Sequence, residues 1–64
     1  MKAVFITNSK GAADDLCCIC AEYGLDFSDS SKGGQYTITV NASSTEIACL
    51  KENEINKSKF TITQ

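Results

Sequence analysis

The chain has 64 residues, of which 42% are hydrophobic and 22% are charged, and its formal net charge at pH 7 is −2. This is the composition of a folded globular chain, and the length leaves room for one small domain, so we expect residues 1–64 to form a single domain. All six basic residues are lysines, and there is no histidine. These absences disfavour an acid–base enzyme and a nucleic-acid-binding protein, which rely on histidine and arginine respectively.

Near the N-terminus, the apolar run at residues 3–6 ends at Thr7 and Asn8. A secretory signal has an apolar centre of about 7 to 15 residues and a membrane span needs about 20, so neither is expected. Three of the four cysteines, Cys17, Cys18 and Cys20, are clustered, which leaves Cys49 as the one distant partner for a disulfide. We therefore expect free thiols and a cytoplasmic protein that does not contact a membrane.

Residues 3–7 are β-branched and aromatic enough to predict a first strand, and residues 8–11 a turn. Residues 12–23 predict a helix that Gly24 closes and that Ser9 or Asn8 caps. At 100° per residue its apolar side chains fall on one stripe. The members of this stripe are Ala12, Ala13, Leu16, Ile19, Cys20 and Tyr23.

Residues 25–28 and residues 36–40 alternate apolar and polar side chains, which predicts two half-buried strands. Residues 29–34 between them predict a loop. Ser43 and Glu46 have the spacing of a capping box, so a second helix is expected to begin there, to bury Ile47 and Leu50, and to end near residue 53. Residues 59–63 predict the last strand.

This order of elements predicts an α+β fold, specifically a two-layer split βαβ (ferredoxin-like, βαββαβ) arrangement with a four-stranded antiparallel sheet and two helices on one face. The alternation of side chains assigns each strand residue to one face of the sheet. The residues expected to face the helices are Val4, Ile6, Leu25, Phe27, Tyr36, Ile38, Val40, Phe60 and Ile62. Those expected on the open face are Phe5, Thr7, Asp26, Ser28, Thr37, Thr39, Thr61 and Thr63.

Cys17 and Cys20 have the C-x-x-C spacing of thiol redox enzymes and of metal sites. Here, however, Cys17 lies well inside the predicted helix, near Asp14 and Asp15, whose negative charge disfavours a thiolate. The order of elements also resembles that of small metallochaperone domains, but their cysteine pair follows the first strand, where residues 8–11 contain none. We therefore predict small apolar packing residues and no catalytic residue, metal site or cofactor, with a thiol- or metal-handling protein kept as an alternative.

Residues 4–9, VFITNS, resemble the first-strand motif of RNA-recognition motif domains. The resemblance implies that Phe5 points outward and stacks on a base. On the third strand those domains carry a basic-glycine-aromatic run, and here Lys32 and Gly33 are followed by Tyr36, which the alternation places on the core side. One stacking residue and a negative net charge disfavour nucleic acid, so a single-stranded nucleic-acid-binding module is the second hypothesis.

The acidic residues are concentrated on the two predicted helices, where they form either a solvated face or a docking surface for a basic partner. We therefore predict a small non-enzymatic module that binds another protein through this acidic helical layer or through the threonine-rich sheet face, with a homodimer through the open sheet as one form. The candidate interaction residues are Phe5, Thr37, Thr39, Thr61, Asp14, Asp15 and Glu22.

Overall fold

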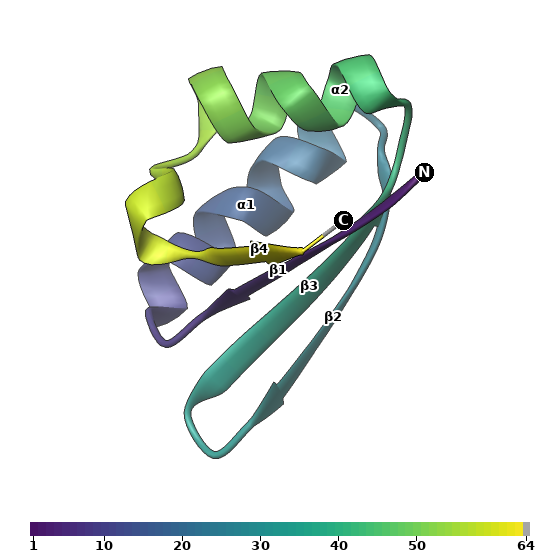
Figure 1. Cartoon of the computed structure of the whole chain (residues 1–64). Coiled ribbons are helices and arrows are strands. Elements are labelled where there is room, and N and C mark those ends of the chain that lie inside the picture. The colour runs from purple at the N-terminus through teal and green to yellow at the C-terminus, as the bar shows by residue number, and fades with distance from the viewer. Residues whose placement is uncertain (64) are drawn as a thin grey trace.

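Four strands form one antiparallel sheet in the order β2-β3-β1-β4 in the computed structural model, which describes residues 1–63. The strands are β1 (Lys2–Thr7), β2 (Asp26–Lys32), β3 (Gln35–Asn41) and β4 (Thr61–Thr63). Two α-helices, α1 (Lys10–Glu22) and α2 (Ser44–Cys49), are drawn on the same side of the sheet in Figure 1, and the β2–β3 hairpin extends beyond them. The predicted α+β class, with a four-stranded antiparallel sheet and two helices, is confirmed.

The predicted cap of α1 is confirmed, because Ser9 Oγ accepts a hydrogen bond from the Ala12 amide at 3.2 Å. The helix begins at Lys10, two residues before the predicted start, and takes in part of the predicted turn. Beyond its end, Gly24 adopts a φ of 68°, the left-handed conformation that glycine tolerates. Leu16 on the predicted stripe is fully buried. The prediction for Tyr23 is wrong: its side chain is 58% exposed, because it follows the last turn of the helix and its hydroxyl reaches out to another element.

The second helical segment departs from a regular α-helix after its first turns. Its capping box is confirmed, since Ser43 Oγ accepts from the Glu46 amide and Glu46 Oε1 accepts from the Ser43 amide. A π-helix, η1 (Leu50–Glu54), then replaces the expected α-helix, and the Ile55 amide donates to the Leu50 carbonyl at 3.2 Å. The next apolar residue after Leu50 comes five positions later, and the wider turn brings Ile55 against the core.

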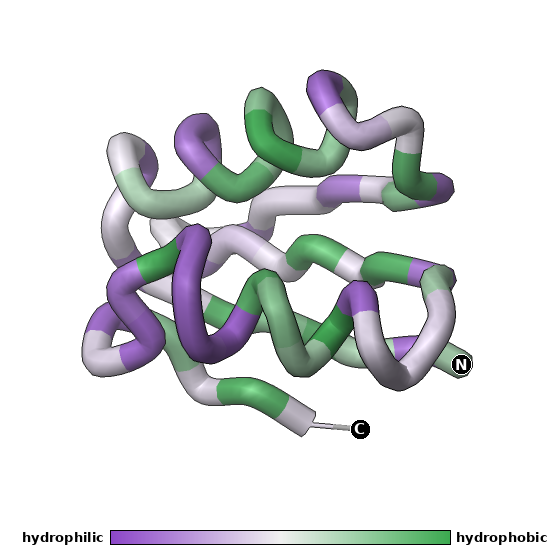
Figure 2. The backbone as a smooth tube through the Cα atoms, turned by 90° about the horizontal axis from the view of Figure 1, so that it is seen from above, coloured by the Kyte–Doolittle hydropathy of each residue, from purple (hydrophilic) through white to green (hydrophobic). Residues whose placement is uncertain are grey.

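A 3₁₀-helix, η2 (Lys57–Lys59), connects this segment to β4, which therefore begins at Thr61 and not at residue 59 as predicted. Figure 2 shows this stretch as mostly hydrophilic, and the apolar Ile55 interrupts it.

The prediction of a loop at residues 29–34 is wrong. Strand β2 continues to Lys32, and only Gly33 and Gly34 form the turn, with φ values of 60° and 81°. Two consecutive positive φ angles are what a two-residue hairpin turn needs, and glycine supplies them without steric strain. Because β2 is an edge strand whose residues are mostly exposed, it accommodates Asp29 and several serines.

The predicted side-chain orientation is wrong for β1. Ala3, Phe5 and Thr7 are buried toward the helices, whereas Val4 and Ile6 lie half-buried on the opposite face. We call the helix-covered side of the sheet the inner face and the other side the outer face. Both sets of β1 side chains are largely apolar, so polarity does not decide which set faces the helices. The size of the side chains and their packing against neighbouring strands decide it.

Phe5 sits at the centre of the inner face, directly opposite Ile38 on β3 and Ile62 on β4. Its ring meets the ring of Phe60 edge-on, with centroids 6.0 Å apart and planes at 87°. On β3 the predicted orientation holds, since Ile38 and Val40 are buried. The core residues, drawn from β1, β3, both helices and η1, are Ala3, Phe5, Ala13, Leu16, Cys20, Ile38, Val40, Ile47 and Leu50.

Replacing Phe5 by alanine should destabilise the protein by about 3 to 5 kcal/mol, because it removes a fully buried aromatic ring from the core. The matched variant Ile6→Ala, one residue along on the outer face, should cost about 1 kcal/mol or less, since Ile6 is only half-buried. Urea unfolding monitored by circular dichroism measures both. Equal losses for the two variants would contradict the observed orientation of β1.

Candidate functional site

The seven candidate interaction residues do not form one surface. Phe5 is fully buried, so its predicted role on the open sheet face is wrong. Thr37, Thr39 and Thr61 lie on the outer face, as their cross-strand partners Ile6 and Val4 show. The other three candidates, Asp14, Asp15 and Glu22, are exposed on α1. The candidates therefore divide between the outer face of the sheet and the helical layer.

None of the five aromatic residues lies on the outer face. Phe5 is in the core, and the three aromatic residues that pack against the core from β2, β3 and the segment before β4 are Phe27, Tyr36 and Phe60. Tyr23 is exposed at the end of α1. The outer face consequently lacks the stacking platform on which single-stranded nucleic-acid recognition depends.

Three glutamates of the second helical segment each have a defined contact. Glu46 belongs to the capping box, and its bonds with Ser43 lower the pKa of its carboxyl group. Glu52 accepts from Lys57 Nζ at 2.9 Å, which also lowers its carboxyl pKa. Glu54, which is partly buried, accepts a hydrogen bond from the hydroxyl of Tyr23. Of the three, Glu54 is the one that connects this segment to α1.

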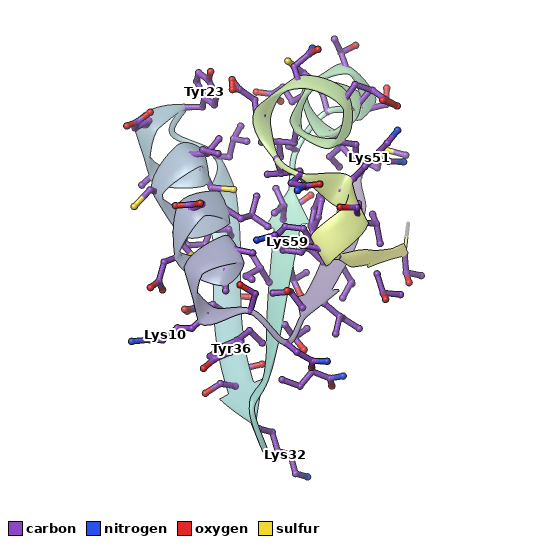
Figure 3. The ribbon with its side chains drawn as sticks, turned by 90° about the vertical axis from the view of Figure 1, so that its left-hand side faces the viewer. Lys10, Tyr23, Lys32, Tyr36, Lys51 and Lys59 are labelled. Atoms are coloured by element: carbon purple, nitrogen blue, oxygen red, sulfur yellow. The ribbon has the colours of Figure 1, made fainter. Side chains whose placement is uncertain are left out.

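A groove of about 300 Å³ lies between the end of α1 and the second helical segment, and we call it the Tyr23 groove. Its lining is mainly apolar, and none of the described residues that line it is basic. In Figure 3, Tyr23 lies at the opposite end of α1 from Lys10. Lys51 extends from its helical turn in the direction away from Tyr23. The lining residues are Tyr23, Leu25, Glu46, Cys49, Leu50 and Glu54.

The Tyr23 hydroxyl lies 2.7 Å from Glu54 Oε1 and 3.1 Å from Oε2. The hydrogen bond to Glu54 raises the pKa of Tyr23, and the negative charge of Glu54 raises it further, with smaller effects from Cys49 and Glu22. The two carboxylates that act on this hydroxyl are those of Glu54 and Glu22. The rim of the Tyr23 groove is a region of negative potential around an exposed aromatic ring.

All four cysteines are free thiols, and they differ in exposure. Cys20 is buried, which raises its pKa to about 11. Cys17 is partly buried, its Sγ lies 4.0 Å from Asp29 Oδ2, and burial followed by the charges of Asp29 and Asp14 raises its pKa. Because thiolates are the reactive species, the Cys17–Cys20 pair lacks the electrostatic environment of a redox centre.

Within residues 1–63, no group of three or more His, Cys, Asp or Glu side chains is arranged to hold a metal ion. No helix in the same part of the chain is long and apolar enough to cross a membrane. Comparison with known proteins gives no match to a family model, to a curated protein or to a solved structure.

The sequence did not indicate the Tyr23 groove, because Leu25 and Leu50 meet only after α1 and the second helical segment pack together. Its one local signal is Tyr23 itself, a large ring placed directly before the helix-ending Gly24. Val4 and Ile6 were also missed as outer-face residues, because their apolar character suits a core position equally well.

Thiol labelling should follow the exposure of the cysteines. Cys18 and Cys49 are expected to react first with a maleimide at pH 7, Cys17 more slowly, and Cys20 only after unfolding, because burial both shields Cys20 and raises its pKa to about 11. Mass spectrometry of peptides from timed reactions measures this order. Fastest labelling at Cys17 would instead support the thiol-handling alternative.

Raising the pH should break the bond between Tyr23 and Glu54. The folded state raises the pKa of Tyr23, so the bond is intact below the ordinary phenol pKa of about 10 and is lost as the pH rises through the higher folded value. In a Tyr36→Phe background, absorbance of the ionised phenol reports Tyr23 alone. Glu54→Gln should lower the pKa of Tyr23 more than the matched change Glu22→Gln does; the reverse order would rule out this contact.

Proposed function

We propose that the protein is a small non-enzymatic module that binds a basic segment of a partner protein in the Tyr23 groove. The observation that carries this proposal is the composition of the groove, which has an apolar floor and an acidic rim with no basic lining residue among those described. The proposal keeps the acidic helical layer as the docking surface and narrows it to one end of that layer.

Both parts of a lysine side chain, the apolar stem and the charged head, match this groove. Its alkyl stem can lie along Leu25, which is half-buried, since long basic side chains bury their stems while the charged head stays at a polar rim. The head group then meets the carboxylate of Glu54 and the ring of Tyr23, whose hydroxyl donates a hydrogen bond to that carboxylate. Complementary charge of this kind mainly speeds and orients association, which suits a reversible partner.

No observation favours the nucleic-acid alternative over this one. Its argument from sequence rested on an outward Phe5, and that ring is buried. The thiol alternative lacks support from the neighbours of Cys17, which are acidic.

We also propose that the fold is of the ferredoxin-like, split βαβ kind and that the protein acts in the cytoplasm. The fold proposal is supported by the antiparallel strand order β2-β3-β1-β4 and by a core to which both helices contribute. The location is supported by four free thiols, which a reducing compartment maintains.

A labelled peptide of alternating lysine and alanine residues tests the groove. At low salt it should bind with a dissociation constant on the order of 100 µM and more weakly as salt is added, while a glutamate–alanine peptide of the same length should not bind. Fluorescence anisotropy measures the affinity, and amide chemical-shift changes should be concentrated at Leu25, Leu50 and Glu54, which line the groove.

Glu54→Gln should weaken binding of the lysine–alanine peptide about fivefold. Glu52→Gln is the matched control, because it removes the same charge from η1 at a residue that pairs with Lys57 and does not line the groove. Equal weakening by the two variants would mean that only net charge matters, and that result would overturn the groove as the binding site.

A further inference from the structure

The outer face of the sheet carries a pattern that the Tyr23 groove does not explain. Half-buried Val4 and Ile6 lie on β1, one of the two central strands, and the other three strands carry small polar side chains in the same rows. The neighbours, placed by their pairing with Val4 and Ile6 or with β3, are Thr37, Thr39, Thr61, Thr63, Ser28 and Ser30. The centre of this face is therefore uncharged and free of aromatic rings.

The strand register makes the face symmetric about one row of residues. That middle row crosses all four strands, pairing Asp29 with Ile38, Ile38 with Phe5, and Phe5 with Ile62. The outer-face row on one side of it is Ser28, Thr39, Val4 and Thr63. The row on the other side is Ser30, Thr37, Ile6 and Thr61. Strand by strand, the two rows match in kind: serine with serine, threonine with threonine, and valine with isoleucine.

We propose that two copies of the chain pack outer face against outer face, related by a two-fold axis that runs across the strands along this middle row. Such a rotation places Val4 of one copy over Ile6 of the other, and each threonine over a threonine. An isologous contact requires a self-complementary surface of this kind, and aligned sheets pack face to face in the same way. The helices and the Tyr23 groove stay on the outside of the dimer.

The charged residues at the ends of β2 fit the same axis. Asp26 and Lys32 lie on the outer face at equal distances from Asp29 along the strand, so the rotation brings Asp26 of each copy over Lys32 of the other. The contact occurs twice by symmetry. On β3, Asn41 and Gln35, which pair with Asp26 and Lys32 respectively, are exchanged in the same way. Along β2 and β3, charge and polarity are thus complementary between two copies of the chain.

The size of the face sets the strength of this dimer. With strands about 4.8 Å apart and a rise of about 3.3 Å per residue, four strands offer roughly 400 Å² per copy, or roughly 800 Å² in total. Stable interfaces bury about 1,200 Å² or more, so the dimer should be weak and reversible. It is therefore to be sought at concentrations from about 10 µM to about 1 mM.

Sedimentation equilibrium over that concentration range tests the proposal on the full chain. The wild-type protein should shift from monomer to dimer, and Ile6→Lys should raise the dissociation constant at least about tenfold, because it buries a charge opposite Val4 of the other copy. Ala21→Lys adds the same charge at an exposed position of α1 and should leave the dissociation constant unchanged. Circular dichroism confirms that each variant is folded.

A charge-reversal pair then tests the two-fold axis. Asp26→Lys and Lys32→Asp should each weaken the dimer several-fold by placing like charges together, and the double variant, which keeps the wild-type net charge of −2, should restore it. A wild-type monomer at 1 mM would overturn the proposal. So would a dimer that Ile6→Lys leaves intact, or a double variant no stronger than either single one.

Discussion

The packing of Phe5 against Ile38 and Ile62 is the interaction on which the rest of the structure depends. These side chains occupy the middle row of the sheet's inner face, where β1 lies between β3 and β4. Because strand side chains alternate with a period of two, burying Phe5 also buries Ala3 and Thr7 and sends Val4 and Ile6 to the outer face. One choice of orientation thus determines both the core and the open surface.

Several elements could be predicted from local sequence because local chemistry alone defines them. Ser9 caps α1, Ser43 and Glu46 form their capping box, and the alternation of β3 correctly buries Ile38 and Val40. In β3 the two sets of side chains differ in polarity, so the assignment of faces is unambiguous. In β1 both sets are apolar apart from Lys2 and Thr7, so alternation could not distinguish them, and contacts with distant residues made the choice.

The other differences between the predicted and the observed structure also arise from long-range packing. Residues 29–32 look like loop residues, yet they pair with β3 because the two-glycine turn sets the register and an edge strand tolerates polar side chains. The π-helical turn forms because it brings Ile55 into contact with the core five residues after Leu50. The Tyr23 groove needs the same segment beside α1, so no local pattern indicates it.

The two candidate binding surfaces, the Tyr23 groove and the outer face, are chemically distinct and lie on opposite sides of the sheet. The groove is acidic and partly aromatic, whereas the outer face is neutral at its centre, so a basic partner and a second copy of the chain would not compete. The composition of the outer face follows from the orientation of β1: an outward Phe5 would remove the ring from the core and would displace Val4 and Ile6 from the open face.

The most direct test of this account is a nuclear Overhauser spectrum of the labelled protein, read at the ring protons of Phe5. The account predicts cross-peaks from this ring to the ring of Phe60 and to the methyl groups of Ile38, its neighbours on the inner face. Cross-peaks from Phe5 to the methyl groups of Thr37 and Thr39 instead would place the ring on the outer face and contradict the account.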